Sequence, residues 1–404
     1  LTPDFVTGLF QSYQAGRMIW NKSQGLPQKP VPCAWFDEKR CQAELCADAP
    51  FFMEKHQHFA QQRAVFLGKE PVRRIGKILE SLPQYTEKPA RFYGRQATVL
   101  MENALSLHQT YHLVHPESRK TLSVGLIRMA NTGPLMALAL GLYQLQLGEA
   151  FPDTHIHLCC YHSRQVLILR SELEEKLDRI LKRDEHQPGG IFTHPEIEQA
   201  LNKSAARHHV FIVLASPVAE IGRDHDYDWA IVEPSSMRSL IQLTGRVWRH
   251  RPGLTASRPN ILIWQFNIKA LINAYTGGHS PAFYWPGFED RAHLLSTHDC
   301  SVLFSPEQLA HISAIPRIVR PDTPDASSRL ADLEHQVMQE LMNNDGLNFV
   351  NAYWQKPDTA NRASAHLQLI SPFRVSRTEE QWLLAPEEGG GFNAYAAEQV
   401  REKG

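Results

Sequence analysis

The chain of 404 residues lacks several features that would define its class at once. It has 42 basic and 43 acidic residues, so no overall positive field attracts nucleic acid, and any such site must be local. The longest apolar stretch, 134–147, is shorter than the about 20 residues that cross a bilayer. No basic region precedes the apolar residues at the start, as it would in a signal peptide. The sequence therefore predicts a protein without membrane contact.

Cysteine is scarce, and its spacing fits no known framework. The six cysteines form no C-x-x-C pair, so the sequence indicates neither a tetrahedral zinc site nor a disulfide scaffold. Cys159 and Cys160 are neighbours in a predicted buried strand. Adjacent core thiols favour the reduced state, so we expect a cytoplasmic protein.

The sequence also contains no G-x-x-x-x-G-K-[ST] phosphate loop. The glycine pairs at 189–190 and 277–278 lack the lysine that this loop requires. Without it, the chain cannot hold a triphosphate by itself. The tripeptide 184–186, Asp-Glu-His, spells the start of a helicase metal-and-water motif, but it follows a charged helix end instead of an apolar strand. We predict a solvated turn there.

Strands and helices alternate from residue 122 onward. Apolar runs predict strands at 123–130, 155–162, 210–216, 229–234 and 260–266. Helices are predicted between them at 134–146, 165–182 and 238–249. This alternation indicates an α/β fold in which a parallel sheet carries helices on both faces. Ligands on such a sheet bind at the carboxyl ends of the strands.

The flanks are less regular. Before the sheet we predict helices at 1–17, 51–66, 71–82 and 90–113 and a proline-rich loop at 24–35. After it we predict an aromatic loop at 276–290, a linker at 317–328 and a helix at 328–342. Later aromatic residues, such as Trp354 and Trp382, suit a small C-terminal domain. The expected domain boundaries are 1–120, 121–275, 276–330 and 331–404.

The clearest motif is Gln242-x-x-Gly245-Arg246-x-x-Arg249, within the predicted helix 238–249. On a helix, residues three apart share a face, so Arg246 and Arg249 would project together. The planar fork of arginine binds phosphate, and in phosphoryl transfer it stabilises the charge of the transition state. The alternative is a solvated basic helix face. The strand, acidic turn and strand that come before the helix favour the phosphate interpretation.

An acidic segment follows the strand 210–216. Its members alternate along the chain: Glu220, Gly222, Asp224, Asp226 and Asp228. Gly222 permits a turn, and Asp224 suits a hydrogen bond to a ribose hydroxyl or a bridge to the arginines. Carboxylates at every second position point in opposite directions on an extended chain, so we expect no metal site here. Asp226 and Asp228 are expected to act as turn and N-cap residues.

Polar residues also end the first two strands of the sheet. Asn131 and Thr132 follow the first, and His162, Ser163 and Arg164 follow the second and precede a helix. A hydroxyl, a guanidinium and a helix N-terminus together suit a nucleic-acid phosphate. The alternative is that Ser163 only caps the helix.

With these residues in place, the sequence resembles the second RecA-like lobe of a superfamily 2 helicase. More narrowly, it is similar to the CRISPR-associated helicase–nuclease of type I systems, subtype I-F. The likeness rests on three stretches within 120–266: CYHSR at 160–164, SPVAEIGRDHDYD at 216–228 and QLTGRVWRHR at 242–251. Pro217 and Gly222 depart from the family's pattern, and Gly222 lacks a hydroxyl that the pattern has.

The resemblance implies a RecA-like sheet, with a role for each matching residue. Arg246 and Arg249 would reach the γ-phosphate, Arg246 as the arginine finger, and Gln242 would orient the phosphate or water. The nucleotide side would comprise Glu220, Gly222, Asp224 and Gly245. The backbone of single-stranded DNA would contact Asn131, Thr132, His162, Ser163 and Arg164.

The resemblance also implies an upstream part of the protein. Leu1-Thr2-Pro3 resembles the segment after the last motif of the family's first lobe, so we expect the chain to begin inside that lobe. The phosphate loop and a metal-dependent nuclease would lie upstream, and ATP with Mg²⁺ would bind jointly to both lobes. The nuclease metal ions would lie only in the upstream domain, and we expect no metal ion in this chain.

The expected activity is 3′-to-5′ translocation on single-stranded DNA after recruitment by an RNA-guided CRISPR surveillance complex. The CRISPR adaptation integrase and phage-encoded inhibitors are further expected partners. Two alternatives stay open on the sequence alone. One is an RNA helicase lobe of the same superfamily, and the other is a non-catalytic module that docks DNA or protein.

Overall fold

A computed structural model describes residues 2–80, 84–86, 88–145, 151, 153–183, 189–220, 222–342, 382–386 and 391–396. The chain divides into two units. One contains Leu1–Phe10 and Lys29–Met342, and the other contains Gln11–Gln28 and Asn343–Gly404. The first unit carries every candidate site residue.

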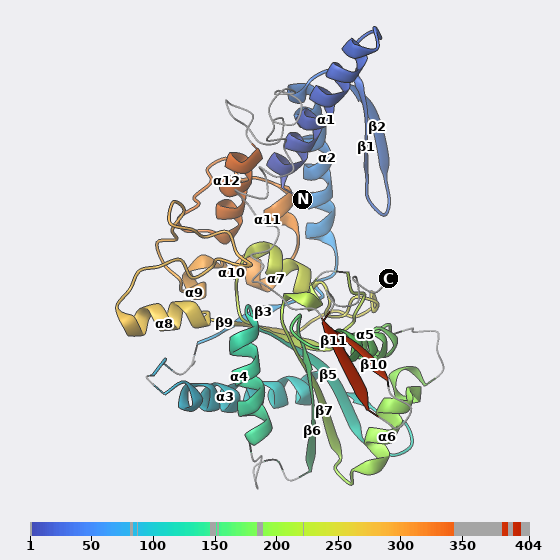
Figure 1. Ribbon diagram of the computed structural model, residues 1–404, viewed down its shortest axis with the longest axis vertical. Helices are drawn as coiled ribbons and strands as arrows, with labels where there is room; N and C mark the ends of the chain where they lie inside the picture. Colours follow the sequence, from blue (N-terminus) through green and yellow to red (C-terminus); the bar gives the residue numbers. More distant parts are fainter. Residues whose placement is uncertain are drawn as a thin grey trace. The chain divides into compact units, whose positions relative to one another are not determined.

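The first unit is built on a seven-stranded sheet (Figure 1). Six strands are parallel and lie in the order β3-β9-β8-β5-β7-β6. Their bounds are Gly76–Leu79 for β3, Thr121–Arg128 for β5, Thr154–Tyr161 for β6, His208–Ala215 for β7, Trp229–Val232 for β8 and Ile261–Trp264 for β9. The short β4, Leu113–Val114, pairs antiparallel with the start of β5. The predicted α/β fold with a parallel sheet is confirmed.

The sheet has an apolar core on each face. The side chains of each strand alternate between these two cores, because successive side chains of a strand point to opposite faces. One face carries Val124 and Leu126 of β5, and the other carries Ile127. Gly125 lies between them and leaves room for the indole ring of Trp229, which a Cβ atom at this position would meet at 2.2 Å. Both faces are therefore buried, as the near-continuous apolar strands predicted.

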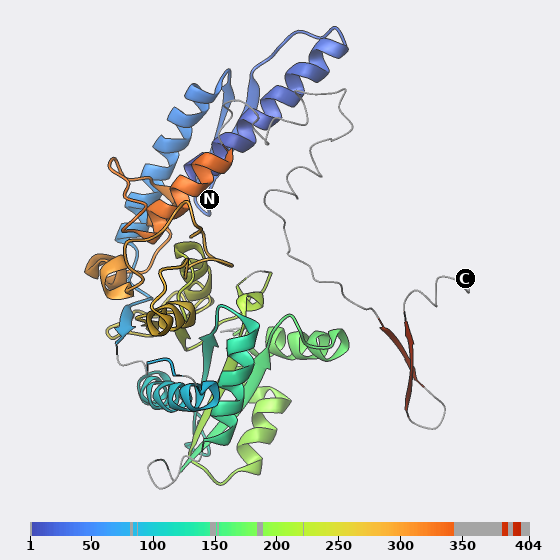
Figure 2. The same cartoon turned by 60° about the vertical axis from the view of Figure 1, so that its left-hand side comes forward.

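Helices cover both faces. The Ile127 face packs against α3, Pro89–Tyr111, and α4, Thr132–Gln144, which lie side by side in both views (Figures 1 and 2). The Val124 face packs against α5, Leu167–Ile180, α6, Pro195–Lys203, and α7, Met237–Thr244. Short 3-10 turns lie at Gly190–Thr193 and Pro217–Ala219.

Further helices of this unit follow β9. They are α8, Ile268–Thr276, α9, Cys300–Leu303, α10, Pro306–Ala310, α11, Ile315–Ile318, and α12, Leu330–Met342. Glu289 organises the loop after α8, because its carboxylate accepts hydrogen bonds from the backbone N–H groups of Ala282 at 2.7 Å, Phe283 at 2.8 Å and Leu295 at 3.0 Å.

The N-terminal region has its own small core. Helix α1 spans Pro3–Ser23, the hairpin β1–β2 pairs Val31–Phe36 with Cys41–Cys46, and α2 spans Ala49–Lys69. The Asp48 carboxylate caps α2 by accepting from Phe51 N at 2.9 Å. The rings of Phe10 and Phe52 stack with centroids 4.5 Å apart.

The second unit contains the strands β10, Trp382–Pro386, and β11, Phe392–Ala396, which pair antiparallel. The sequence predicted a small C-terminal domain here. Most of 343–404, including Trp354, lies outside the described residues. The Asp-Glu-His turn predicted at 184–186 also lies outside them.

Three local predictions are wrong. The segment predicted as a helix over 71–82 contains β3, which pairs with β9 at the edge of the sheet. The loop predicted over 24–35 includes most of β1. The helix predicted over 238–249 ends at Thr244. In the first two cases the partner strand is distant or follows a turn, so a local pattern does not reveal it.

Candidate functional site

The predicted site residues follow the carboxyl ends of four neighbouring parallel strands. Asn131 follows β5, His162 follows β6, Glu220 follows β7, and α7 follows β8. Because β8, β5, β7 and β6 are adjacent in the sheet, these residues gather at one edge of it. This edge is where α/β sheets bind ligands.

The arginine motif begins on α7 and continues beyond it. Ser236 caps this helix by accepting from Ser239 N at 3.1 Å. After Gly245 the backbone pairs with Tyr227, because Tyr227 N donates to Arg246 O at 2.8 Å and Trp248 N donates to Tyr227 O at 3.1 Å. Trp248 has φ of +52°, which no helix contains. The expectation that Arg246 and Arg249 share a helical face is therefore wrong.

Arg246 is nevertheless directed to the acidic segment. Its Nη2 donates to the main-chain carbonyl of Glu220 at 3.0 Å. The residue is 9% exposed, and its Nε is buried without a hydrogen-bond partner among the described residues. Burial and then repulsion from Arg249 lower the pKa of this guanidinium. An additional anion is the group that this environment accepts most readily.

Arg249 is exposed and also contacts the acidic segment. Its Nε donates to the carboxylate of Asp224, and His250 Nε2 lies 3.3 Å from the second oxygen of that carboxylate. Arg246 and Arg249 therefore both contact the acidic segment, one at Glu220 and the other at Asp224. The two arginines thus approach each other through the turn after Gly245, and not through a shared helical face as the sequence predicted.

The other two members of the arginine motif have different surroundings. Gln242 is half-buried on α7, and its amide forms no hydrogen bond within the part of the chain that the structure describes. Gly245 is the C-cap of α7, and its N–H donates to Ile241 O at 3.0 Å. Gln242 is thus available to a ligand, whereas Gly245 ends the helix before Arg246.

Glu220 is buried and paired, which the sequence did not predict. Its Oε1 accepts from Arg128 Nε at 2.6 Å and from Ser239 Oγ at 2.5 Å. Arg128, fully buried at the end of β5, also donates to Ser235 Oγ at 2.8 Å and to Glu233 O at 2.7 Å. This pair connects β5, the acidic segment and the start of α7. The signal in the sequence was an arginine at the end of an otherwise apolar strand.

Gly222 adopts φ of +71°, in the left-handed region that glycine enters without strain. No atom lies within 4 Å of a Cβ built on it, so the backbone angle and not crowding favours glycine here. The predicted turn is confirmed. Asp224 follows it, with a side chain that is 66% exposed.

Asp226 and Asp228 have a larger role than the predicted turn and N-cap. Both are fully buried and bind Arg251, at 2.6 and 2.7 Å. Asp228 also pairs with Arg183 at 2.9 Å and accepts from Val124 N at 2.7 Å. Although burial opposes it, attraction to Arg183 and Arg251 holds the pKa of Asp228 below its usual value. The segment before β8 and the end of the arginine motif are therefore fixed to one another.

Arg223 connects the acidic segment to α5. Its guanidinium donates to Tyr161 Oη at 3.1 Å and to Asp178 at 2.9 Å, and it pairs with Glu174. His225 Nε2 donates a further hydrogen bond to Asp178 Oδ1 at 2.8 Å. The turn that carries Gly222 and Asp224 is thus attached to the helix that follows His162.

Asn131 and Thr132 lie at the N-terminus of α4. Asn131 is the N-cap but makes no side-chain capping hydrogen bond. The first backbone N–H groups of a helix have no partner within it. Both residues are half-buried, so their polar atoms and the free N–H groups are placed together at the sheet edge.

The turn at His162 presents two exposed polar side chains. The buried His162 shapes this turn. Its ring Nδ1 accepts from Arg164 N at 3.2 Å, and its backbone N–H donates to Gln165 Oε1 at 3.1 Å. Ser163 and Arg164 are exposed. The alternative that Ser163 caps the helix is wrong, because the N-cap of α5 is Val166, without a side-chain bond. The guanidinium of Arg164 makes no hydrogen bond or ion pair with the described residues.

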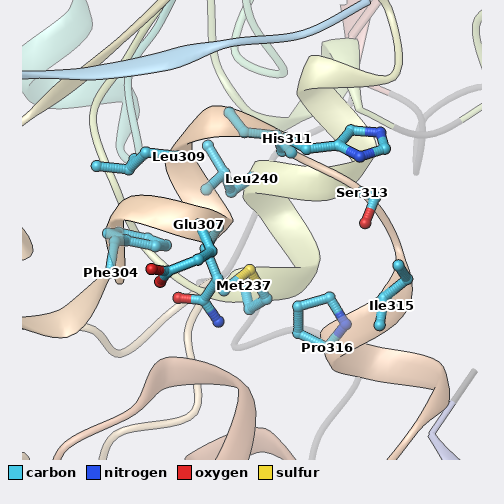
Figure 3. Close-up of a pocket in the computed structure, with 11 residues that line it drawn as sticks. Met237, Leu240, Phe304, Glu307, Leu309, His311, Ser313, Ile315 and Pro316 are labelled. Atoms are coloured by element: carbon cyan, nitrogen blue, oxygen red, sulfur yellow. The ribbon is translucent and has the colours of Figure 1, made fainter. Parts of the chain in front are cut away.

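A cavity of about 220 Å³ lies beside α7. Figure 3 shows Met237 and Leu240 of α7 facing Phe304, Leu309 and Pro316 across it. Its lining is mostly apolar. None of the predicted nucleotide or DNA residues lines it.

Metal-binding clusters and membrane-spanning helices are both missing from the described ranges. These ranges contain no group of three or more histidine, cysteine, aspartate or glutamate side chains placed to hold a metal ion. They also contain no helix that has both the length and the apolar character needed to cross a membrane.

Comparison with known proteins finds similar sequences. Residues 123–252 match the family model described as CRISPR-associated nuclease/helicase Cas3, C-terminal. Over 397 residues the chain is 41% identical to the Cas3 nuclease/helicase of subtype I-F/YPEST from Pseudomonas aeruginosa, covering 96% of this chain and 35% of that protein. The chain matches the C-terminal region of Cas3 of subtype I-F.

A second Cas3 of the same subtype, from Pectobacterium atrosepticum, is 40% identical over 95% of this chain and 35% of its own length. The chain thus spans about a third of the length of both relatives, 35% in each case. The crystal structure of T. fusca Cas3-AMPPNP is 18% identical, with a TM-score of 0.32 over 48% of this chain and 18% of that chain. This last likeness is weak.

Proposed function

We propose that the chain is the second motor lobe and C-terminal part of an ATP-dependent translocase that moves 3′ to 5′ on single-stranded DNA during CRISPR interference. The observation that supports this best is Arg246. Its guanidinium is held by Glu220 O, yet its buried Nε has no partner among the described residues. A buried cation with a free donor suits a phosphate that arrives from outside the lobe.

The nucleotide residues then divide by geometry. Arg246 would stabilise the charge that develops on the γ-phosphate, because it is already oriented and largely desolvated. Arg249, exposed and paired with Asp224, would exchange this partner for phosphate. Gln242 would orient the phosphate or the attacking water with its free amide. The ribose and the backbone of the nucleotide would contact four further residues, Glu220, Gly222, Asp224 and Gly245.

The first lobe would supply the phosphate loop, which this chain does not contain. Mg²⁺ held there would neutralise phosphate charge during hydrolysis. We also place the nuclease domain, with its metal ions, in the upstream part of the longer protein. The two curated relatives carry both names, nuclease and helicase, and about two-thirds of their length lies outside the match, which covers 35%.

Single-stranded DNA would lie across the ends of β5 and β6. The exposed Ser163 and Arg164, with Asn131, Thr132 and the N-terminus of α4, would contact its phosphates without reading its sequence. His162 would hold the turn. An RNA-guided CRISPR surveillance complex would deliver this strand, and the adaptation integrase and phage inhibitors would be further partners.

The test is ATP hydrolysis by the native polypeptide that contains this chain, with and without single-stranded DNA. In the Arg246→Ala variant, turnover should fall by about 10³-fold or more, because a transition-state arginine contributes that much. Arg179→Ala is the matched control, since it removes an arginine whose ion pair with Glu196 lies on the surface. This control should keep wild-type turnover.

Other outcomes would replace the proposal. Unchanged turnover in Arg246→Ala would be compatible with a motor lobe but would contradict the role of Arg246 as the arginine finger. Stimulation by RNA in preference to DNA would favour an RNA helicase. Complete absence of ATP hydrolysis in the native polypeptide would favour a non-catalytic module that docks DNA or protein.

A further inference from the structure

Arg74 contacts the arginine motif from a distant part of the chain. It lies just before β3, and its guanidinium donates from Nε to Val247 O at 3.1 Å and from Nη2 to Gly245 O at 3.4 Å. These two carbonyls belong to the residues on either side of Arg246. Arg74 therefore holds the backbone from which the Arg246 side chain extends.

Arg74 is itself mounted on a rigid support. The amide of Asn260 donates to Arg73 O at 2.8 Å and accepts from Ile75 N at 3.0 Å. The carbonyl of Arg74 accepts from Ile312 N at 3.1 Å. The backbone is thus fixed on both sides of Arg74, and the guanidinium can transmit that position to Gly245 and Val247.

Asp226 and Glu70 attract the charge of Arg74 only from beyond ion-pair distance. Within the described part of the chain it forms no ion pair with a carboxylate. Desolvation, and then repulsion from Arg73, lowers its pKa to about 10. A neutral side chain would fill the same space without this cost. What the guanidinium adds is a planar fork that reaches two carbonyls at once.

The far end of the same segment is also fixed. Asp226 accepts from His250 N at 3.0 Å and from Arg251. The segment is therefore anchored at two places, and the carbonyls that Arg74 holds are the nearer to Arg246 along the chain. Small errors in the position of the Arg246 guanidinium would slow the proposed hydrolysis of ATP, because misplacing a catalytic group by about 1 Å can reduce the rate about 10²-fold.

We propose that Arg74 is a positioning residue for Arg246, one that acts on the rate of ATP hydrolysis through the carbonyls of Gly245 and Val247. The inference rests on the proposed function. It adds a residue that lies outside the matched range 123–252 and that no motif in the sequence indicated.

The test compares Arg74→Gln and Arg74→Lys with the wild type in the native polypeptide, with saturating single-stranded DNA. We expect kcat for ATP hydrolysis to fall about 10- to 100-fold, while KM for ATP stays within about 2-fold, because only the transition state needs Arg246 in place. Lysine restores the charge but not the fork, so it should recover little of the loss.

Arg73→Ala is the matched control, since the neighbouring arginine makes no side-chain hydrogen bond with the described residues. It should keep kcat within about 2-fold of the wild type. In an Arg246→Ala background, Arg74→Gln should add no more than about a 2-fold loss, because both changes remove the same contribution.

Three results would overturn the inference while the proposed function stands. The first is wild-type kcat in both Arg74 variants while Arg246→Ala loses its activity. The second is that the losses of kcat multiply in the double variant. The third is a loss of kcat accompanied by faster hydrogen exchange throughout the sheet, which would show a merely structural role. A wild-type polypeptide that hydrolyses no ATP would instead reject the proposed function itself.

Discussion

The proposed nucleotide side and the proposed DNA side share one edge of the sheet but are held in different ways. On the nucleotide side, buried ion pairs fix the backbone, with Asp226 and Asp228 on Arg251 and Glu220 on Arg128. On the DNA side, Ser163 and Arg164 are exposed, and Arg164 has no partner within the described chain. The difference agrees with the proposed function, because phosphoryl transfer needs a preorganised environment and contacts to a moving strand must form and break at each step.

The largest effect should come from Asp228→Ala, which leaves Arg183 and Arg251 buried without their shared carboxylate. Breaking a buried pair costs about 3–5 kcal/mol. Hydrogen exchange of the amides of β5 and β8 in the native polypeptide would measure this loss as faster local opening. Glu172→Ala, which removes an exposed pair with Lys176, should leave the exchange rates of the same amides unchanged.

This contribution should also depend on pH. The folded pKa of Asp228 is lowered, so its stabilisation is present above about pH 4 and is lost as the pH falls through the lowered value. Equal exchange rates in Asp228→Ala and the wild type at neutral pH would contradict the idea that buried charge fixes the nucleotide side.

A smaller effect is expected from Arg164→Ala. Loss of one phosphate contact should weaken binding of single-stranded DNA equally for all sequences and reduce the slope of log K against log salt by about 0.7. Hydrogen exchange of the sheet should stay unchanged, because the Arg164 guanidinium makes no hydrogen bond or ion pair with the described residues. Fluorescence titration at several salt concentrations gives the slope, with Arg179→Ala as the charge-matched control. An unchanged slope would remove Arg164 from the DNA site.

The smallest effect concerns pH at the same turn. Burial and then repulsion from Arg164 lower the pKa of His162, so it stays neutral and keeps accepting from Arg164 N. The ratio of the DNA affinities of wild type and His162→Gln should therefore stay constant between pH 8 and pH 6.5. A ratio that grows on acidification would show that His162 becomes charged and binds phosphate directly.

The sequence predicted the sheet well because β5, β7 and β8 bury both faces and read as apolar runs. It placed Arg246 and Arg249 correctly near the acidic segment but attributed this to a helix. The pairing of Val247 with Tyr227 and the positive φ of Trp248 depend on contacts across the fold, which a local pattern does not contain. For the same reason Arg74, Arg128 and Arg183 read as ordinary arginines until the structure gave each its partner.

The pairing of β3 with β9 has a consequence for how the protein is made. Ile75 and Asn260, which join the two strands, are 185 residues apart. A ribosome adds about 5–20 residues per second, so about 10–40 s pass between the emergence of one and the other. Throughout that interval Arg74 has been synthesised, but Asn260, which supports it, has not. Arg74 can therefore reach its supported position, and hold the carbonyls on either side of Arg246, only after Asn260 has left the ribosome.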